Sequence, residues 1–355
     1  MRALSPRILR HLARSLVFSL LASRLHAADS FRLFPPPPQH YFQEIPDAAP
    51  RALDLDFSHP FSGGDGSGFE TQVRGMGSVA PRAPRRTAVT LVTLGVLGGS
   101  VASALGTGHD RETFHWANER WFQEDTYAGG GDKASHFVFY NGLSRELAVQ
   151  YRIWGYGKDQ ATLMAFATAA AAGLIVEVGD GLTVFGFSWE DFVMDTLGAG
   201  TAAVVTRLGL DDTVGFRFGK MPSEEPPECC RAPGIGKDYS TEIYTADLKI
   251  SGFARRLNVR PGAARFLLVS MSYGTKGYRY SPPEFRQRQI GLEVGVNFPE
   301  VLAAARVPED RWWGRALYFF FNFFRIPYTQ IGVRYDLNHH KWHGPDAGNS
   351  YDPGP

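Results

Sequence analysis

Acidic and imidazole side chains recur at the ends of three segments with helical apolar spacing, between residues 131 and 206. They form three pairs, at the start of the first segment, the end of the second and the start of the third: Asp132 and His136, Glu177 and Asp180, and Asp191 and Asp195. The members of each pair are three or four residues apart, so they project from one face of a helix. Carboxylates and an imidazole in one place can hold a divalent cation, move protons or activate water.

Short connections between these three helices would gather the side chains at one end. The links over residues 151–158 and 181–187 are short and favour antiparallel neighbours. The start of the first helix, the end of the second and the start of the third then lie on one side. We therefore expect Glu177 to face the interior and His136 to contact a carboxylate from another helix. The predicted cluster has seven members: Asp132, His136, Glu177, Asp180, Ser188, Asp191 and Asp195.

Helix capping is an alternative role for part of this cluster. Asp132 has the position of an N-cap, and Ser188 with Asp191 has the spacing of a capping box. Glu177 does not fit this role, because negative charge is unfavourable at the end of a helix. Carboxylates that meet in a poorly hydrated bundle also need a cation or protons to neutralise them. Two interpretations stay open: an ion-binding cluster, and a structural polar network around a protonated His136.

Five carboxylates and one imidazole are the donors of a hard cation. Magnesium, manganese or calcium is favoured over zinc, which would more often recruit further histidines or cysteines. The candidate ligands are His136, Glu177, Asp180, Asp191 and Asp195. The sequence contains no serine-hydrolase elbow, P-loop, dinucleotide-binding glycine pattern or HExxH motif, so those common chemistries have no support.

Composition indicates a folded protein with no general affinity for polyanions. The chain has 355 residues, of which 44% are hydrophobic, enough for buried cores. Its 37 basic and 36 acidic residues nearly cancel, so we predict no nucleic-acid partner. The only cysteines, Cys229 and Cys230, are adjacent and cannot join distant parts of the chain. We expect exposed loop thiols or a local vicinal disulfide there.

The N-terminal part of the chain is predicted to be a targeting segment followed by a linker. In residues 1–27, four arginines precede a short apolar run and small residues follow it, which is typical of a signal peptide. An arginine-rich organelle presequence is the alternative. Residues 28–86 are rich in proline and glycine without a sustained apolar period, so we predict a disordered linker.

The remainder predicts an α+β fold. Residues 87–212 form a small-residue-packed antiparallel bundle of about four helices, associated with a membrane. Its first helix, residues 87–107, lacks charge and could cross a bilayer, and small residues at every fourth position, including Gly99 and Gly173, would let helices approach closely. A linker over 213–237 and a small antiparallel β-sheet over 238–338, with strand-like alternation, follow. Residues 339–355 are expected to be a polar tail.

Three motifs in this order resemble the YfiM-like predicted periplasmic lipoproteins: GDKASHF, EVGDG and GFSWEDFVMDTLGA. The likeness covers residues 130–206, and a more distant one is to the VanZ-like membrane proteins. It implies a helical core and a place in the cell envelope, on the periplasmic side and associated with a membrane. It implies no known activity. No cysteine follows the N-terminal apolar segment, so we expect no lipid anchor of the lipoprotein kind.

The function predicted from these features is that of a cell-envelope protein whose buried acidic and histidine cluster has a structural or ion-binding role. The alternative is a membrane-associated metal-dependent hydrolase that acts on an envelope lipid or precursor, with His136 as ligand or base and a bound water as nucleophile. Membrane or envelope components are the expected partners. The basic residues Arg145 and Arg152 lie opposite the cluster and would face the cytoplasm in an inner-membrane bundle, whereas a cleaved export signal argues for the periplasmic side.

Export predicts a processed N-terminus. Protein isolated from its native host should begin near residue 28, because the small residues Ala27 and Ala28 follow the apolar run. N-terminal sequencing checks this. A cytoplasmic pool that still begins with Met1 would contradict the signal peptide and restore the inner-membrane orientation.

Overall fold

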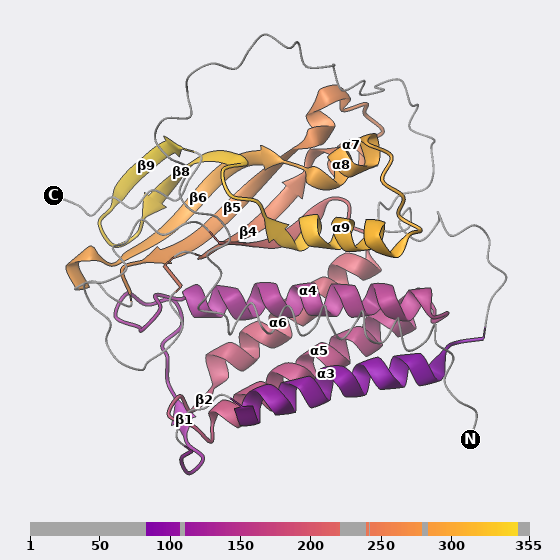
Figure 1. Cartoon of the computed structure of the whole chain (residues 1–355). Coiled ribbons are helices and arrows are strands. Elements are labelled where there is room, and N and C mark those ends of the chain that lie inside the picture. Colours follow the sequence, from indigo (N-terminus) through magenta and orange to yellow (C-terminus); the bar gives the residue numbers. More distant parts are fainter. Residues whose placement is uncertain (1–82, 107–110, 221–238, 241, 279–282, 347–355) are drawn as a thin grey trace, which may run out of the picture.

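The computed structural model describes residues 83–106, 111–220, 239–240, 242–278 and 283–346. The predicted signal peptide, most of the predicted linker over 28–86 and the two cysteines lie outside these ranges. The described residues form seven α-helices and a seven-stranded, mostly antiparallel sheet, which confirms the α+β class. Figure 1 shows the long helices packed together on one side of the sheet.

The helical layer consists of four helices: α3 (Arg86–Gly106), α4 (Gly131–Ile153), α5 (Lys158–Asp180) and α6 (Trp189–Arg207). α4 packs against both α5 and α6, and α3 packs on α5 (Figure 1). Alanines at every fourth position of α5, among them Ala161 and Ala165, are fully buried against Tyr151 of α4. Small side chains therefore bring these helices close together, as their spacing predicts.

Two helices, α3 and α5, are long and apolar enough to cross a membrane, judged by length and composition. They differ in environment. Val89 is the one buried residue of α3, whereas α5 buries nine residues, including Glu177. α5 is thus a core helix of the layer, and α3 is an apolar helix on its outside.

Glycines mark the closest helix contacts, although not at every predicted position. A Cβ added to Gly173 would lie 2.5 Å from Asp195 Oδ2, and one on Gly198 would overlap the backbone oxygen of Phe137. These two positions therefore require glycine. The prediction of close approach at Gly99 is wrong: an added Cβ meets nothing within 4 Å, because this side of α3 faces away from the layer.

The sheet has the strand order β7-β3-β4-β5-β6-β8-β9, and only the β3–β7 pair is parallel. Its strands are β3 (Val214–Lys220), β4 (Glu242–Lys249), β5 (Leu267–Lys276), β6 (Gln287–Val296), β7 (Phe324–Arg325), β8 (Gln330–Asp336) and β9 (Lys341–Asp346). Short helices connect them: α7 (Ile250–Arg256), α8 (Phe298–Ala304) and α9 (Trp312–Phe323). Val138 of α4 packs on Tyr244 of β4, which joins the helical layer to the sheet.

Two sequence boundaries need correction. The predicted linker over 213–237 is wrong in its first part, since residues 214–220 form β3, and residues 221–237 lie outside the described ranges. The predicted polar tail over 339–355 is wrong for residues 341–346, which form β9 at the sheet edge. β9 has no apolar alternation of its own and is held by its pairing with β8.

Substitutions at Gly198 and Gly99 should therefore have opposite effects on stability. Gly198→Ala forces α6 away from the α4 backbone and should lower the free energy of unfolding by about 1–3 kcal/mol. Gly99→Ala has open space and should be neutral or stabilising by up to about 1 kcal/mol through helix propensity. Thermal and denaturant unfolding of both variants checks this. Equal effects at the two positions would contradict the packing described here.

Candidate functional site

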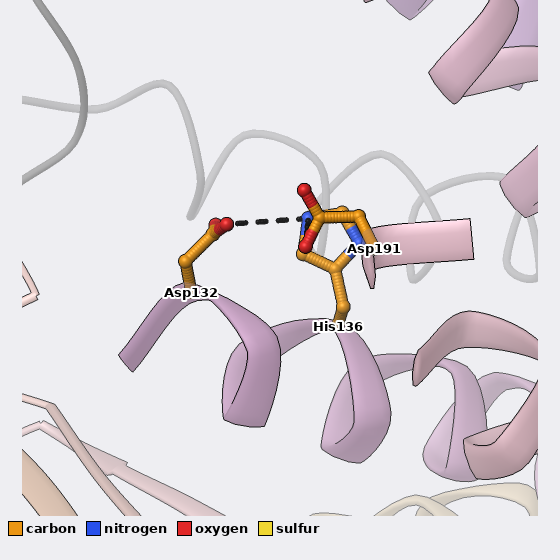
Figure 2. Close-up of side chains that lie close together, drawn as sticks. All are labelled: Asp132, His136 and Asp191. Carbon is orange, nitrogen blue, oxygen red and sulfur yellow. Dashed lines mark ion pairs between the residues drawn. The ribbon is translucent and has the colours of Figure 1, made fainter. Parts of the chain in front are cut away.

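The start of α4, the end of α5 and the start of α6 meet around the His136 imidazole. His136 Nδ1 lies 2.8 Å from Asp195 Oδ1 and 3.9 Å from Glu177 Oε1, and its Nε2 lies 3.7 Å from Asp132 Oδ1 and 3.9 Å from Asp191 Oδ1. Figure 2 shows Asp132 and Asp191 beside the ring. Both geometric expectations are confirmed: His136 hydrogen-bonds a carboxylate from another helix, and the Glu177 side chain is 2% exposed.

Ser188 links two of the helices through its main chain and side chain. It is the N-cap of α6, where its Oγ accepts a hydrogen bond from Asp191 N at 3.2 Å, and its own N donates to Glu177 Oε2 at 3.2 Å. The expected capping role of Ser188 is thus confirmed. That of Asp132 is wrong, because the N-cap of α4 is Gly130 and makes no side-chain cap. Asp132 is left to interact within the cluster.

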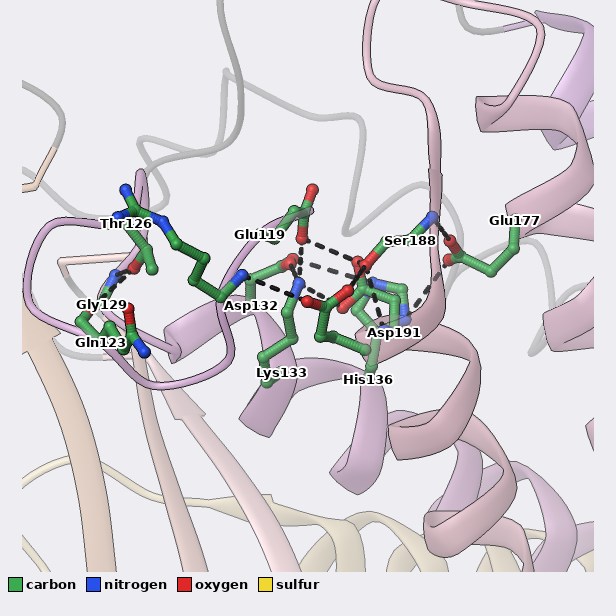
Figure 3. A network of polar contacts seen from close by, with 12 residues as sticks. Glu119, Gln123, Thr126, Gly129, Asp132, Lys133, His136, Glu177, Ser188 and Asp191 are labelled. Carbon is green, nitrogen blue, oxygen red and sulfur yellow. Dashed lines mark hydrogen bonds and ion pairs between the residues drawn. The ribbon is translucent and has the colours of Figure 1, made fainter. Parts of the chain in front are cut away.

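Lys133 is the cation that the sequence analysis missed. Its side chain is 1% exposed, and its Nζ lies 2.9 Å from Asp132 Oδ2, 2.8 Å from Asp191 Oδ1 and in contact with Glu119 (Figure 3). A lysine in the first turn of a helix opposes the helix dipole. That unfavourable position, beside Asp132 in the GDKASHF run, was the available signal for acidic partners from elsewhere.

The segment before α4 supplies Glu119 and covers the cluster. It is anchored by β1 (Trp116–Ala117), which pairs in parallel with β2 (Phe187–Ser188) next to the α6 cap. Tyr239, just before β4, closes another side and donates to Asp132 Oδ1 at 2.5 Å. Glu119 and Tyr239 were also missed, because no periodicity connects them to the helices.

Two titratable residues lie apart from this centre: His115, in the segment before α4, and Asp180, at the end of α5. His115 is half-buried, and its Nδ1 lies 3.7 Å from Glu112 Oε2, apart from the cluster. Asp180 is half-buried and belongs to neither group of candidate metal ligands found among the described residues. The charge of His136 nevertheless affects the pKa of Asp180. Asp180 is therefore a neighbour of the centre.

The imidazole separates two sets of possible metal ligands. Asp132, His136 and Asp191 form one set, and His136, Glu177 and Asp195 form the other, each with ligand atoms within 4.8 Å of one another. The first set already holds the Lys133 ammonium. In the second set, Asp195 is fully buried and its Oδ2 has no hydrogen-bond partner among the described residues. The two sets therefore differ in how far their charge is neutralised.

Burial dominates the proton affinities of the cluster. It raises the pKa of Glu177 to about 9, that of Glu119 to about 8 and that of Asp180 to about 6. Burial also raises the pKa values of Asp191 and Asp195 above their usual range.

For Asp132 and His136, neighbouring charges outweigh the effect of burial on the pKa. Burial would raise the pKa of Asp132, but the charges of Lys133 and His136 outweigh it and hold that pKa below its ordinary value. Burial would lower the pKa of His136, but Asp191 and Asp195 outweigh it and raise that pKa well above 6.5. The carboxylates around His136 thus favour its protonated form.

Comparison with known proteins supports the resemblance drawn from the motifs. A family model described as a predicted periplasmic lipoprotein (DUF2279) matches residues 118–207, about a quarter of the chain. This range includes Glu119, Lys133 and every predicted member of the cluster. The family's description agrees with the predicted place on the periplasmic side of the cell envelope. The chain has no significant match among curated proteins or among solved structures.

The raised pKa of Glu177 predicts a stability that falls with pH in the absence of metal. Between the ordinary value of 4.5 and about 9, folded Glu177 keeps a proton that the unfolded chain releases, so the free energy of unfolding decreases as pH rises. The raised pKa of His136 acts in the same direction, since its stabilisation is lost as pH rises through the folded pKa. Thermal unfolding from pH 5 to 9 in chelator measures the slope. Glu177→Gln should flatten it, and an unchanged slope in this variant would contradict the assignment.

Proposed function

We propose that this protein is a membrane-associated protein of the cell envelope whose cluster binds one divalent cation between His136, Glu177 and Asp195. The observation that carries the proposal is the Asp195 Oδ2 atom, a buried carboxylate oxygen without a hydrogen-bond partner among the described residues. Leaving such a group unsatisfied is costly, and a cation or a proton must neutralise it.

The charge balance favours a cation on this side of the imidazole. Lys133 forms ion pairs with Asp132, Asp191 and Glu119, so this half of the cluster contains a positive charge of its own. Among the described residues, His136 is the cation within ion-pair distance of Glu177 and Asp195, and Glu177 also accepts a hydrogen bond from Ser188 N. A divalent cation bound there would leave His136 neutral, with Nδ1 as a ligand atom and Nε2–H directed at Asp132 and Asp191.

The donor set favours a hard cation. Oxygen ligands of magnesium, manganese and calcium lie about 2.0–2.6 Å from the ion, so donors on opposite sides are about 4–5 Å apart. The candidate atoms lie within 4.8 Å of one another. The set offers two carboxylates, one imidazole nitrogen and no sulfur. Zinc usually recruits more nitrogen or sulfur donors than this.

Membrane association is proposed for the helical layer, with α3 to α6 as a four-helix bundle. α3 carries the argument, because its described residues from Thr87 to Gly106 are uncharged and its exposed residues include Leu94, Val101 and Leu105. Transfer of such an apolar surface from water to hydrocarbon is favourable. Membrane lipids and other envelope components are the partners that fit this surface.

A metal-dependent hydrolase that acts on an envelope lipid or precursor is the second candidate. One observation favours it: the His136 side chain is 21% exposed, while Glu177 and Asp195 are 2% and 0% exposed. A substrate would thus meet the imidazole first. This candidate requires the same ion together with a water that it activates.

Metal titration of chelator-stripped, full-length protein tests the ion. We expect one stoichiometric ion by elemental analysis, and a rise in the unfolding temperature with manganese, magnesium or calcium, because an ion that binds only the folded state stabilises it. Glu177→Gln and Asp195→Asn should each weaken binding by more than about tenfold, which is about 1.4 kcal/mol.

Glu146→Gln is the control, because Glu146 is a half-buried carboxyl on α4 that accepts a hydrogen bond from Gln150 Nε2 outside the cluster and whose pKa burial raises to about 7. It should bind metal like the unmodified protein. Absence of binding at millimolar metal would overturn the proposal and leave a structural network around the His136 cation. Loss of binding in all three variants would show a general effect on folding and would also contradict the site.

A further inference from the structure

The seven-stranded sheet has one apolar face and one charged face, and the charged face is the buried one. On β4, β5 and β6 the positions alternate between apolar side chains such as Leu248, Met271 and Leu292 and polar ones such as Asp247, Ser270 and Glu293. Asp247 and Glu293 are 1% exposed, whereas Met271 and Leu292 are 62% and 58% exposed. A sheet that is half-buried in a water-soluble domain has the opposite arrangement.

Ion pairs and hydrogen bonds fill the charged face. Arg217 of β3 donates from Nη2 to Asp247 Oδ1 at 3.2 Å, and Arg334 of β8 donates from Nη1 to Glu293 Oε1 at 3.2 Å. Ser270 Oγ donates to Asp247 Oδ1 at 2.6 Å. These charges are therefore paired within the fold, although some buried polar atoms of this face, among them Gln289 Oε1 and Gln330 Oε1, have no hydrogen-bond partner among the described residues.

One ion pair shows that the sheet curls toward this face. Arg325 of β7 lies 2.9 Å from Glu293 of β6 (Nη1 to Oε2), although three strands separate them in the sheet. Strands are about 4.8 Å apart, so a flat sheet would place these two backbones about 19 Å from each other, too far for the side chains to meet. The charged face is thus concave, and the apolar face is convex.

The convex face is a continuous apolar surface over four neighbouring strands. Met271 lies opposite Leu292, and Val294 lies opposite Ile331, which is 60% exposed. α4 covers the far end of this face, at Tyr244, and no other described helix or strand covers Met271, Leu292 and Ile331. Contiguous apolar patches of this kind mark a surface that binds a partner or a membrane.

We propose that the convex face of the sheet binds lipid acyl chains. The inverted polarity selects this partner, since a sheet with apolar side chains outside and paired charges inside is the form that hydrocarbon stabilises. The apolar positions of β6 run from Ile290 to Val296, about 20 Å along the strand at about 3.3 Å per residue. That length is comparable to the apolar band of about 25 Å on lipid-facing sheets.

Aromatic residues border this surface as expected at a lipid–water boundary. Tyr335 of β8 and Trp342 of the edge strand β9 lie opposite each other with ring centroids 5.1 Å apart, and Trp342 is 68% exposed. Tyrosine and tryptophan prefer the headgroup region, where one side of the ring is apolar and the other is wet. The sheet contact is separate from the ion site and from the α3 surface, so each can fail alone.

Site-specific fluorescence in lipid vesicles tests the contact. In full-length protein with Cys229 and Cys230 replaced by serine, Leu292→Cys carries an environment-sensitive label, and Asp159→Cys is the control, because the Asp159 side chain at the start of α5 is 74% exposed. Vesicles of phosphatidylethanolamine and phosphatidylglycerol contain lipids with a spin label on the acyl chain. The Leu292 label should shift to the blue and be quenched several-fold more than the Asp159 label.

Two further labels keep the outcomes distinct. Ile331→Cys replaces Leu292→Cys if the latter does not fold, and Leu94→Cys reports on α3. Quenching at Leu94 with none at Leu292 and Ile331 would overturn the sheet proposal while the α3 surface stands. A blue shift without acyl-chain quenching would also overturn it, and would mean that a second copy or another segment of this chain covers the face; light scattering separates these two.

Discussion

Neutralisation of buried acids by two neighbouring cations determines how the ends of α4, α5 and α6 meet. Lys133 contacts Asp132, Asp191 and Glu119, and His136 lies between two pairs of carboxylates. Burial of charge is expensive unless each charge is paired, and removing one partner usually costs more than the pair contributes. The main effect of the cluster is therefore to select one arrangement of the three helix ends. Its net contribution to stability is smaller.

Helix packing and the cluster depend on each other. Gly173 leaves the space that Asp195 occupies, and Gly198 lets α6 approach the backbone of α4. The same close approach buries Asp195 completely and raises its pKa. A divalent cation between His136, Glu177 and Asp195 would remove the repulsion that this packing creates, and the small residues would in turn hold the ligands in place.

The helices and the cluster could be predicted because their signals are local. Spacings of three or four residues placed the acids on one face, and short connectors ordered the helices. Lys133, Glu119 and Tyr239 escaped because their role comes from tertiary contacts. Strand alternation was visible in the sequence, but it does not say which face is buried, and here the charged face is inside. The exposed position of Gly99 and the pairing of β9 likewise depend on neighbours that no spacing reveals.

Direct detection of a bond between the ion and His136 is the most decisive measurement for the proposed cation site. Electron spin-echo envelope modulation of the manganese-loaded protein reports the nuclei bound to the ion. The cluster predicts coupling to one histidine nitrogen, which His136→Gln abolishes and His115→Gln leaves unchanged, since His115 lies apart beside Glu112. Bound manganese with no nitrogen coupling, or coupling that survives in His136→Gln, would contradict the account.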